Sequence, residues 1–237
     1  MSDSAENQES GVTPESRQTS DATINNMQYK LKERYIIDFA EPIETLNMNG
    51  GKAYQTSDRI DKDRLLFALI CGSETTPRHS ILPYIKSLKS PHLLNLIEYG
   101  VVTLPNNGGM AMALIYQQPV GGRVIDDISL PFREDIAKIQ SLWSDLLSSL
   151  RELHSCGITH RAIRLDNLFY ADEEKKNIVL GDCAASFPAY YQPAVYETVE
   201  SLMAKRESRG NGTTKNDIYA LAVLGVFLYL GKENGSD

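Results

Sequence analysis

The sequence has few cysteines and no long apolar run, and each absence excludes a class of protein. Its three cysteines, Cys71, Cys156 and Cys183, form no CxxC pair and are too few for a disulfide framework. We expect them to be reduced, structural thiols. The longest apolar run, from Ile218 to Gly231, is 14 residues long, whereas a membrane-spanning helix needs about 20. This run predicts a buried core helix and no membrane span in this chain.

The sequence also lacks a secretory signal and a basic block. Its N-terminus, MSDSAENQES, has no basic segment followed by an apolar stretch, so we expect a cytoplasmic location. The 24 basic residues are outnumbered by 31 acidic ones, which gives a net charge of −7. Because binding to a phosphate backbone depends on clustered Lys and Arg, no nucleic-acid partner is expected.

Residues 1–28 are expected to form a disordered acidic tail. Up to Asn26 the segment is rich in Ser, Thr, Asn, Gln and acids and has almost no large apolar residue. It therefore cannot bury enough apolar surface to offset the entropy lost on ordering. Five acids and one arginine give it a charge of −4, more than half of the net charge (Asp3, Glu6, Glu9, Glu15, Asp21 and Arg17).

Residues 29–118 are expected to form a small lobe of five strands and one helix. Turn chemistry separates KERYIIDF, KAYQTS and LLFALIC, which predicts a three-stranded antiparallel meander at 32–39, 52–57 and 65–71. Two more strands are expected at 93–102 and 110–116. Before them, four apolar residues recur at helical spacing and predict a short helix (Ile81, Leu82, Ile85 and Leu88).

Residues 119–237 show the patterns of a mainly helical lobe. Apolar residues with a helical period mark one face of a long amphipathic helix that ends at Cys156-Gly157 (Ile136, Ile139, Leu142, Trp143, Leu146, Leu147, Leu150 and Leu153). NLFY (167–170) and NIVLG (177–181) flank a polar turn and predict a hairpin. Two more helices are expected, one over 195–205 and the buried one from Asp217.

Four segments in this order resemble the catalytic core of protein kinases. A leucine-rich helix ends in LHSCGITHRAIRLDNL, a hairpin follows, LGDCA stands where kinases have Asp-Phe-Gly, and DIYALAVLGVFLYLG stands at their buried central helix. The resemblance covers about Tyr29 to the C-terminus. It implies an α+β, two-lobed, serine/threonine-kinase-like fold, with a five-stranded lobe and a helical lobe that lacks its C-terminal helices.

The same resemblance places unsuitable residues at the main catalytic positions. Ala162 stands where kinases have the aspartate that accepts the substrate's proton, and a methyl group cannot accept one. Asp166, the nearest carboxylate in sequence, is expected to face away. Ile70 occupies the position of the phosphate-binding lysine, and Ile81 that of its glutamate partner. Since a lone buried charge is costly, two apolar residues at these positions form a coherent replacement that can pack together.

The nucleotide-binding positions are partly retained. Gly51 is the glycine that remains of the glycine-rich loop, whose first two glycine positions carry Leu46 and Met48. The resemblance places Ala53 against the nucleotide. It gives Asn167 and Asp182 the role of Mg²⁺ ligands. Two readings stay open here: either the two residues still bind ATP with Mg²⁺, or they serve the fold alone and no cofactor binds.

Three further residues fit structural roles in the kinase pattern. Asp217 is expected to accept hydrogen bonds from backbone amides of the loop that contains His160 and Arg161. No Ser, Cys or metal ligand has the spacing to form a catalytic triad with His160. Cys183 beside Asp182 is not expected to be a nucleophile, because a neighbouring acid raises a thiol pKa.

These residues predict a pseudokinase, a scaffold or allosteric module, with or without nucleotide sensing, that lacks efficient phosphoryl transfer. Its partners are expected to be one or more proteins of unidentified type. Two alternatives remain. One is an atypical, weakly active ATP-dependent serine/threonine kinase or other nucleotide-dependent transferase, since positioning and metal electrostatics carry much of phosphoryl transfer. The other is a domain that supports further domains beyond Asp237.

Overall fold

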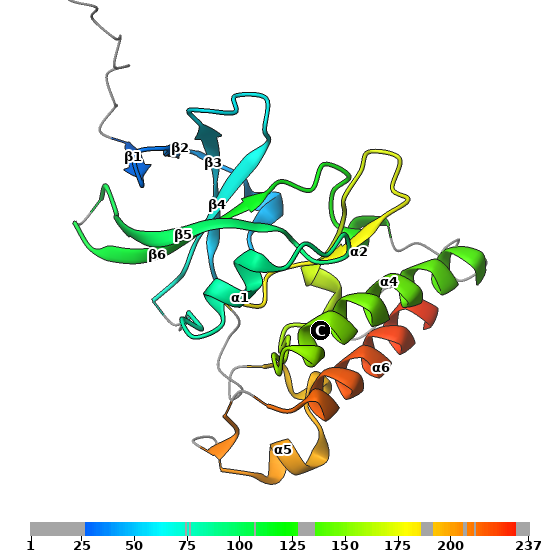
Figure 1. Ribbon diagram of the computed structural model, residues 1–237. Helices are drawn as coiled ribbons and strands as arrows, with labels where there is room; N and C mark the ends of the chain where they lie inside the picture. The colour runs from blue at the N-terminus through cyan, green and yellow to red at the C-terminus, as the bar shows by residue number, and fades with distance from the viewer. Residues whose placement is uncertain are drawn as a thin grey trace, which may run out of the picture.

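The computed structural model describes residues 27–73, 75, 77–106, 108–127, 136–185, 192–205, 208–210 and 212–230. An antiparallel sheet with a short helix beside it forms one part of the molecule, and two long helices dominate the other (Figure 1). Residues 1–26, nearly all of the expected tail, lie outside the described residues. Met27 and Gln28 belong to the fold, because Gln28 begins the first strand and its Nε2 donates to Asp38 at 2.6 Å.

The sheet has six strands rather than the five expected. Their order is β1-β2-β3-β4-β6-β5, with β1 Gln28–Leu31, β2 Tyr35–Pro42, β3 Lys52–Asp58, β4 Leu66–Ile70, β5 Leu96–Thr103 and β6 Met110–Gln117. The extra strand arises because Lys32 and Glu33 adopt left-handed φ angles of 49° and 57°. These two residues begin the first predicted strand (32–39) but form a tight turn, so that strand starts only at Tyr35, and β1, which precedes the turn, pairs with it as a hairpin. The β2–β3–β4 meander is confirmed.

The two faces of the sheet pack into different hydrophobic clusters. The sheet curls until β1 also contacts β5, and it encloses a barrel cluster (Leu31, Tyr35, Ile37, Phe39, Leu66, Ala68, Ile70, Ile97, Val102, Ala113 and Ile115). The opposite face joins the helical part in a larger junction cluster, which includes Leu46, Met48, Ala53, Phe67, Leu69, Cys71, Leu82, Ile85, Leu146, Leu180 and Leu224. Alternate residues of β4 thus belong to alternate clusters.

The remaining elements are mostly helical. They are α1 Leu82–Ser87, α2 Val124–Asp127, α4 Ile136–Ser155, α5 Val199–Met203, α6 Thr214–Leu230, the β7–β8 hairpin of Leu168–Tyr170 and Ile178–Leu180, and 3-10 turns at Glu44–Leu46, Leu165–Asn167 and Ala194–Tyr196. The hairpin and the long amphipathic helix were predicted from the sequence and are confirmed. Helix α4 ends where Gly157 adopts a φ of 70°.

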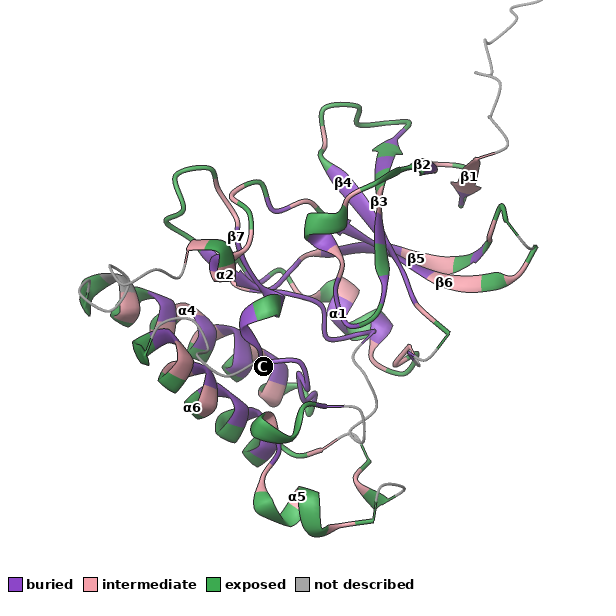
Figure 2. Ribbon diagram, turned by 180° about the vertical axis from the view of Figure 1, so that it is seen from behind, coloured by how far each residue is buried: buried purple, intermediate pink, exposed green. Residues whose placement is uncertain are grey.

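Two predicted helices differ from the structure. The one expected over 195–205 is divided, because Thr198 is extended and its Oγ1 caps the short α5 by accepting from the Ser201 amide at 3.2 Å. The one expected to be buried, α6, packs beside α4 and is buried on one face only (Figure 2). Ile218, Val226 and Tyr229 are each about half exposed. No helix among the described residues is long and apolar enough to span a membrane.

Candidate functional site

The candidate site lies where the sheet meets the helical part and is centred on the Asp182 carboxylate. Asp182 follows β8 and is almost completely buried. Its Oδ1 accepts hydrogen bonds from the Tyr116 hydroxyl and from the Ala184 amide at 2.8 Å. Its Oδ2 accepts from Asn49 Nδ2 at 3.0 Å and from the Ala185 amide at 2.9 Å. Since a carboxylate has about four lone-pair sites, donors from the protein itself occupy all of them.

Asn49, in the β2–β3 loop (43–51), links this carboxylate to other segments. Its φ of 48° is left-handed, a conformation that asparagine tolerates better than most residues. Besides the Asp182 carboxylate, its Nδ2 donates to the Asp182 carbonyl at 2.9 Å, and its own carbonyl accepts from Thr75 Oγ1 at 2.9 Å. Its Oδ1 accepts from Arg164 Nη2 at 2.8 Å. The loop is therefore held down onto the helical part.

Arg164 completes this group of side chains. Its Nη1 donates to Gln192 Oε1 at 3.1 Å, and its Nε donates to Asp166 Oδ1 at 3.0 Å. Asp166, the nearest carboxylate to Ala162 in sequence, is half exposed and paired with this arginine. Because Asp166 is paired with Arg164, it does not replace the catalytic base that is missing at Ala162.

One tyrosine and two cysteines near Asp182 stay protonated at neutral pH. Burial, followed by the negative charge of Asp182, raises the pKa of the Tyr116 hydroxyl well above its ordinary value, so it remains a donor. Burial, and secondly the negative charge of Asp182, also raises the pKa of the Cys71 and Cys183 thiols to about 12. Neither thiol is a nucleophile at neutral pH, because the reactive form is the thiolate.

Asn167, the second expected metal ligand, is bonded within its own loop. Its Nδ2 donates to the carbonyls of Ala162 at 2.8 Å and Asp182 at 3.0 Å. Its Oδ1 is buried without a partner among the described residues and lies against Gly181. A Cβ at Gly181 would stand 2.1 Å from that oxygen, so glycine is required for this close approach. The amide of Asn167 supports the turn after β8.

The three expected structural residues form a second buried group. Asp217 at the start of α6 accepts from the His160 amide at 2.7 Å, the Arg161 amide at 3.0 Å and His154 Nε2 at 2.8 Å. The His160 ring accepts from the Ala162 amide at Nδ1 and donates from Nε2 to the Gly181 carbonyl. Burial lowers the pKa of His160 to about 4, so its ring is neutral.

Arg161 adopts a φ of 66°, and its guanidinium is buried against Glu197. Nη2 donates to Glu197 Oε1 at 2.9 Å. Both side chains are nearly inaccessible to water, and a single unpaired charge in such a place would be costly. Each side chain neutralises the charge of the other. The ion pair fixes the segment before α5 to the loop that contains His160.

The two isoleucines that replace the kinase ion pair do not form the expected pair. Ile70 belongs to the barrel cluster, whereas Ile81, the residue before α1, packs against the junction cluster on the other face of the sheet. The neighbours of Ile70 that face the junction are Leu69 and Cys71. The idea that Ile70 packs with Ile81 is therefore wrong, because successive side chains of a strand point to opposite faces.

ATP with Mg²⁺ does not fit the residues present at this junction. Leu46 and Met48 belong to the junction cluster and are almost completely buried. Ala53 is fully buried and donates its amide to Asn47 Oδ1 at 2.8 Å. The Gly51 amide donates to the Met48 carbonyl at 2.7 Å, so it is not free for a phosphate. A Mg²⁺ ion binds through the lone pairs of oxygen ligands. The lone pairs of the Asp182 carboxylate already accept hydrogen bonds from the protein.

Several residues that form this site were not singled out by sequence reasoning. Tyr116 was read only as part of a strand, and Asn49 only as part of the NMNGG turn. Arg164 and Glu197 were not identified either. The Asn and Gly residues of the NMNGG turn could have indicated that Asn49 adopts a left-handed φ. Its hydrogen bond to Asp182, 133 positions later in the chain, leaves no local pattern in the sequence.

Comparison with known proteins supports the fold. No protein-family model matches the sequence, and no curated protein matches it. The structure is similar to that of Rad53 1–466 in complex with AMP-PNP, with a TM-score of 0.57 and 14% sequence identity. The match covers 79% of this chain and 47% of the Rad53 chain, so this chain spans about half the length of that protein. The chain therefore has an α+β fold of the protein-kinase-like type.

Proposed function

We propose that the protein is a pseudokinase, a protein-kinase-like module that binds protein partners and does not transfer phosphate. The observation that carries this proposal is the Asp182 carboxylate, whose oxygens accept four hydrogen bonds from the protein. In kinases the equivalent acid holds the metal ion that bridges the phosphates. Here the acid instead holds the sheet, through Tyr116 and Asn49, to the helical part.

The surroundings of Asp182 support the same proposal. Ala162 is fully buried, and its amide and carbonyl both bond within the loop, to His160 and Asn167. General-base catalysis contributes typically 10²- to 10⁴-fold to an enzymatic rate, and no carboxylate stands at this position to supply it. The group of residues that closes the junction resembles a structural link more than a reaction centre.

We propose further that the module acts without nucleotide. Rad53 was crystallised with AMP-PNP, but in this chain Met48 and Asn49 are buried, and Asn49 donates to the Asp182 carboxylate. We place this role in the cytoplasm, where free cysteines such as Cys71 and Cys183 stay reduced. The partner is a protein of unidentified type.

Thermal unfolding in the presence of nucleotide tests the proposal. We expect the same Tm without ligand, with millimolar ATP, and with millimolar ATP and Mg²⁺, because only a ligand that binds the folded state raises stability. Incubation with labelled ATP and a mixture of Ser, Thr and Tyr peptides is expected to give no more incorporation than a sample without protein.

The Asp182→Asn variant is the matched control for this experiment. A rise in Tm that requires Mg²⁺ in the wild type and disappears in the variant would contradict the proposal and support a weakly active kinase. Because the variant also loses hydrogen bonds, the decision rests on the wild-type curve. The variant only shows whether an increase in Tm with ATP and Mg²⁺ depends on the Asp182 carboxylate.

A further inference from the structure

The outer face of α6 is apolar along its length. From Ile218 to Leu230 the helix has no charged residue. One side of the helix packs on the core, and the residues of the opposite side are exposed (Figure 2): Ile218, Tyr219, Ala222, Val226, Tyr229 and Leu230. A continuous exposed apolar surface usually marks an interaction site. None of these residues belongs to the candidate site around Asp182.

Four residues of this face have the spacing of a helix–helix seam. Tyr219, Ala222, Val226 and Tyr229 follow one another at intervals of three, four and three residues. This is the a/d spacing of a coiled coil, in which each side chain fits between side chains of the facing helix. The outer face of α6 is therefore shaped to receive another helix.

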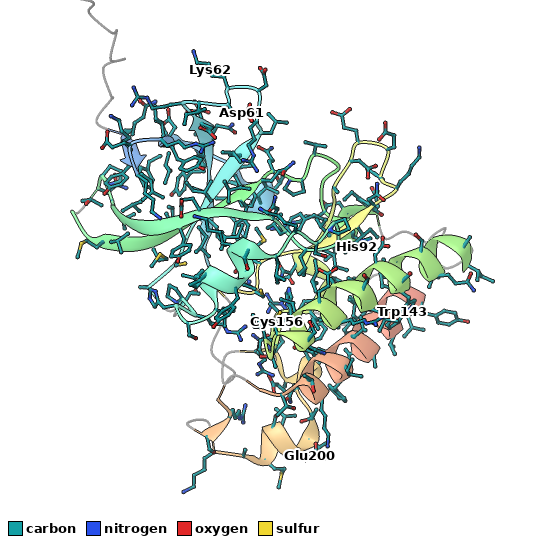
Figure 3. The ribbon with its side chains drawn as sticks, in the orientation of Figure 1. Asp61, Lys62, His92, Trp143, Cys156 and Glu200 are labelled. Atoms are coloured by element: carbon teal, nitrogen blue, oxygen red, sulfur yellow. The ribbon has the colours of Figure 1, made fainter. Side chains whose placement is uncertain are left out.

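A groove lies at one end of this seam, and a projecting aromatic side chain lies at the other. The groove has a volume of about 900 Å³. Ile218, Tyr219 and Ala222 form one wall, and α5, with the loop after it, forms the other, on the side where Figure 3 labels Glu200. Tyr229, which is 62% exposed, lies about 15 Å along the axis from Tyr219 at 1.5 Å per residue. One helix thus carries both a hollow and a bulky side chain of suitable size.

We propose that this face is a homodimer interface, in which α6 packs antiparallel to α6 of a second copy of the chain. With the twofold axis between Ala222 and Val226, Tyr229 of each copy enters the groove of the other beside Tyr219. Ala222 then faces Val226, a small residue against a larger one. The same contact forms twice, so the assembly closes at two copies. This pairing is independent of whether the protein binds nucleotide.

The charges at the ends of α6 favour the antiparallel direction. Lys215, which is exposed in the first turn, would lie beside the C-terminal end of the partner helix, where the helix dipole is negative. A parallel pair would instead bring the two Lys215 side chains together, and like charges repel. Along the seam itself no charges meet, because the segment from Ile218 to Leu230 has none.

The exposed area of the face determines how strong the pairing is. Its five large side chains, those of Ile218, Tyr219, Val226, Tyr229 and Leu230, are between 39% and 62% exposed. At about 150–250 Å² for each large side chain, they present on the order of 500 Å². A stable interface of standard size takes about 800 Å² from each partner. We therefore expect a weak dimer with a Kd above about 10 µM, so that unfolding at about 1 µM reports on the monomer.

Analytical ultracentrifugation between about 1 µM and 500 µM tests the proposal. We expect the mass of the wild type to rise with concentration from 26.4 kDa toward twice that value and no further. Val226→Glu places a charge at the centre of the seam and is expected to raise the Kd at least about tenfold. Ile60→Glu changes an exposed isoleucine of the β3–β4 turn and is the matched control, expected to dimerise as the wild type does. Circular dichroism verifies that both variants are folded.

A pair of charge variants tests the antiparallel register. Tyr219→Lys and Tyr229→Glu are each expected to stay monomeric alone, because each puts two charges into the homodimer. An equimolar mixture is expected to dimerise, since opposite charges then meet at one end and two tyrosines at the other.

Four results would overturn the proposal. A monomeric wild type over the whole concentration range would show that a second copy does not cover this face, and the face would then belong to another partner. Particles that grow beyond two copies would exclude a closed pair. Equal effects of Val226→Glu and Ile60→Glu would place the contact elsewhere. A mixture of the two tyrosine variants that stays monomeric would contradict the antiparallel register.

Discussion

At the residue scale, Asn49 shows how one side chain closes the junction. Its amide donates to Asp182 and accepts from Arg164, and its carbonyl accepts from Thr75. These contacts join the β2–β3 loop to three segments that all lie later in the chain, around Thr75, Arg164 and Asp182. All the groups involved are shielded from water, so each hydrogen bond that is lost leaves a buried polar atom without a partner.

Replacement of Asn49 by glycine is expected to lower the free energy of unfolding by about 1–3 kcal/mol. Glycine tolerates the left-handed φ, so the loss reports the side-chain bonds and not backbone strain. Urea unfolding followed by circular dichroism measures the change. Asn106→Gly, in the exposed β5–β6 turn, is the matched control and is expected to have little effect. Equal losses in the two variants would show that the Asn49 side chain adds no stability.

His160 gives the molecule a defined dependence on pH. Its pKa is about 4 in the folded protein because it is buried, whereas the value for an unfolded chain is about 6.5. Below pH 6.5 the unfolded state therefore binds more protons, and stability falls as the pH approaches 4. We expect a loss of about 1–2 kcal/mol between pH 7 and pH 5 from this residue.

The variant His160→Gln is expected to remove most of that pH-dependent loss, although it is less stable at pH 7. His79→Gln, which changes an exposed histidine, is expected to retain the slope of the wild type. Urea unfolding of all three proteins at several pH values measures the slopes. A wild-type slope that persists in His160→Gln would mean that other groups cause it.

The residues of the site could be predicted from the sequence only in part. The motif order placed Asn167, Asp182, His160 and Asp217 in neighbouring segments, and the structure brings them to one region. What the motif could not provide was the state of the Asp182 carboxylate. That state depends on donors from Asn49 and Tyr116, which come from other strands and loops and carry no signal of their own.

At the element scale, α6 is apolar on all sides but buried on one. Ala220, Leu221, Leu224 and Leu228 face the core, while Val226 and Tyr229 are exposed (Figure 2). A helix that is apolar all round is usually buried all round, which is why the sequence predicted a fully buried helix. Periodicity cannot identify the packed face of such a helix, because every face has the same composition.

Two substitutions in α6 separate its faces. Leu224→Ala removes a side chain with no exposed surface and is expected to cost about 2–5 kcal/mol in unfolding free energy. Val226→Ala, two positions along and half exposed, is expected to change it by less than about 0.5 kcal/mol. Urea unfolding measures both. A large loss in Val226→Ala would indicate that the exposed face is covered in solution.

Strands and helices with a strong local pattern were predicted well. The β2–β3–β4 meander, the β7–β8 hairpin and α4 have turns and periods that act over a few residues. Errors arose where the conformation or direction of one or two residues changes the outcome. The left-handed turn at Lys32 and Glu33 created a sixth strand, and the alternation of β4 placed Ile70 on the face opposite to the junction.

At the scale of the whole molecule, several contacts tie the sheet to the helical part. Asn49 bonds to Asp182 and Arg164, and β8 bonds to the loop before β5. Arg78, before α1, donates to the Thr159 carbonyl at 2.6 Å and the Cys183 carbonyl at 3.2 Å. The junction cluster also contains residues of both parts. These links predict one cooperative unit without an open hinge.

The single tryptophan, Trp143 in α4, makes this cooperativity measurable. It lies in the helical part, packed near Gly225 of α6 (Figure 3), whereas Asn49 belongs to a loop of the sheet. In a two-state protein, Trp143 fluorescence and circular dichroism give the same urea midpoint. Since the two parts share one core, we expect Asn49→Gly to lower both midpoints equally. A Trp143 midpoint that stays at the wild-type value in this variant would show that the helical part unfolds independently, and the junction would then be a contact between two separate domains.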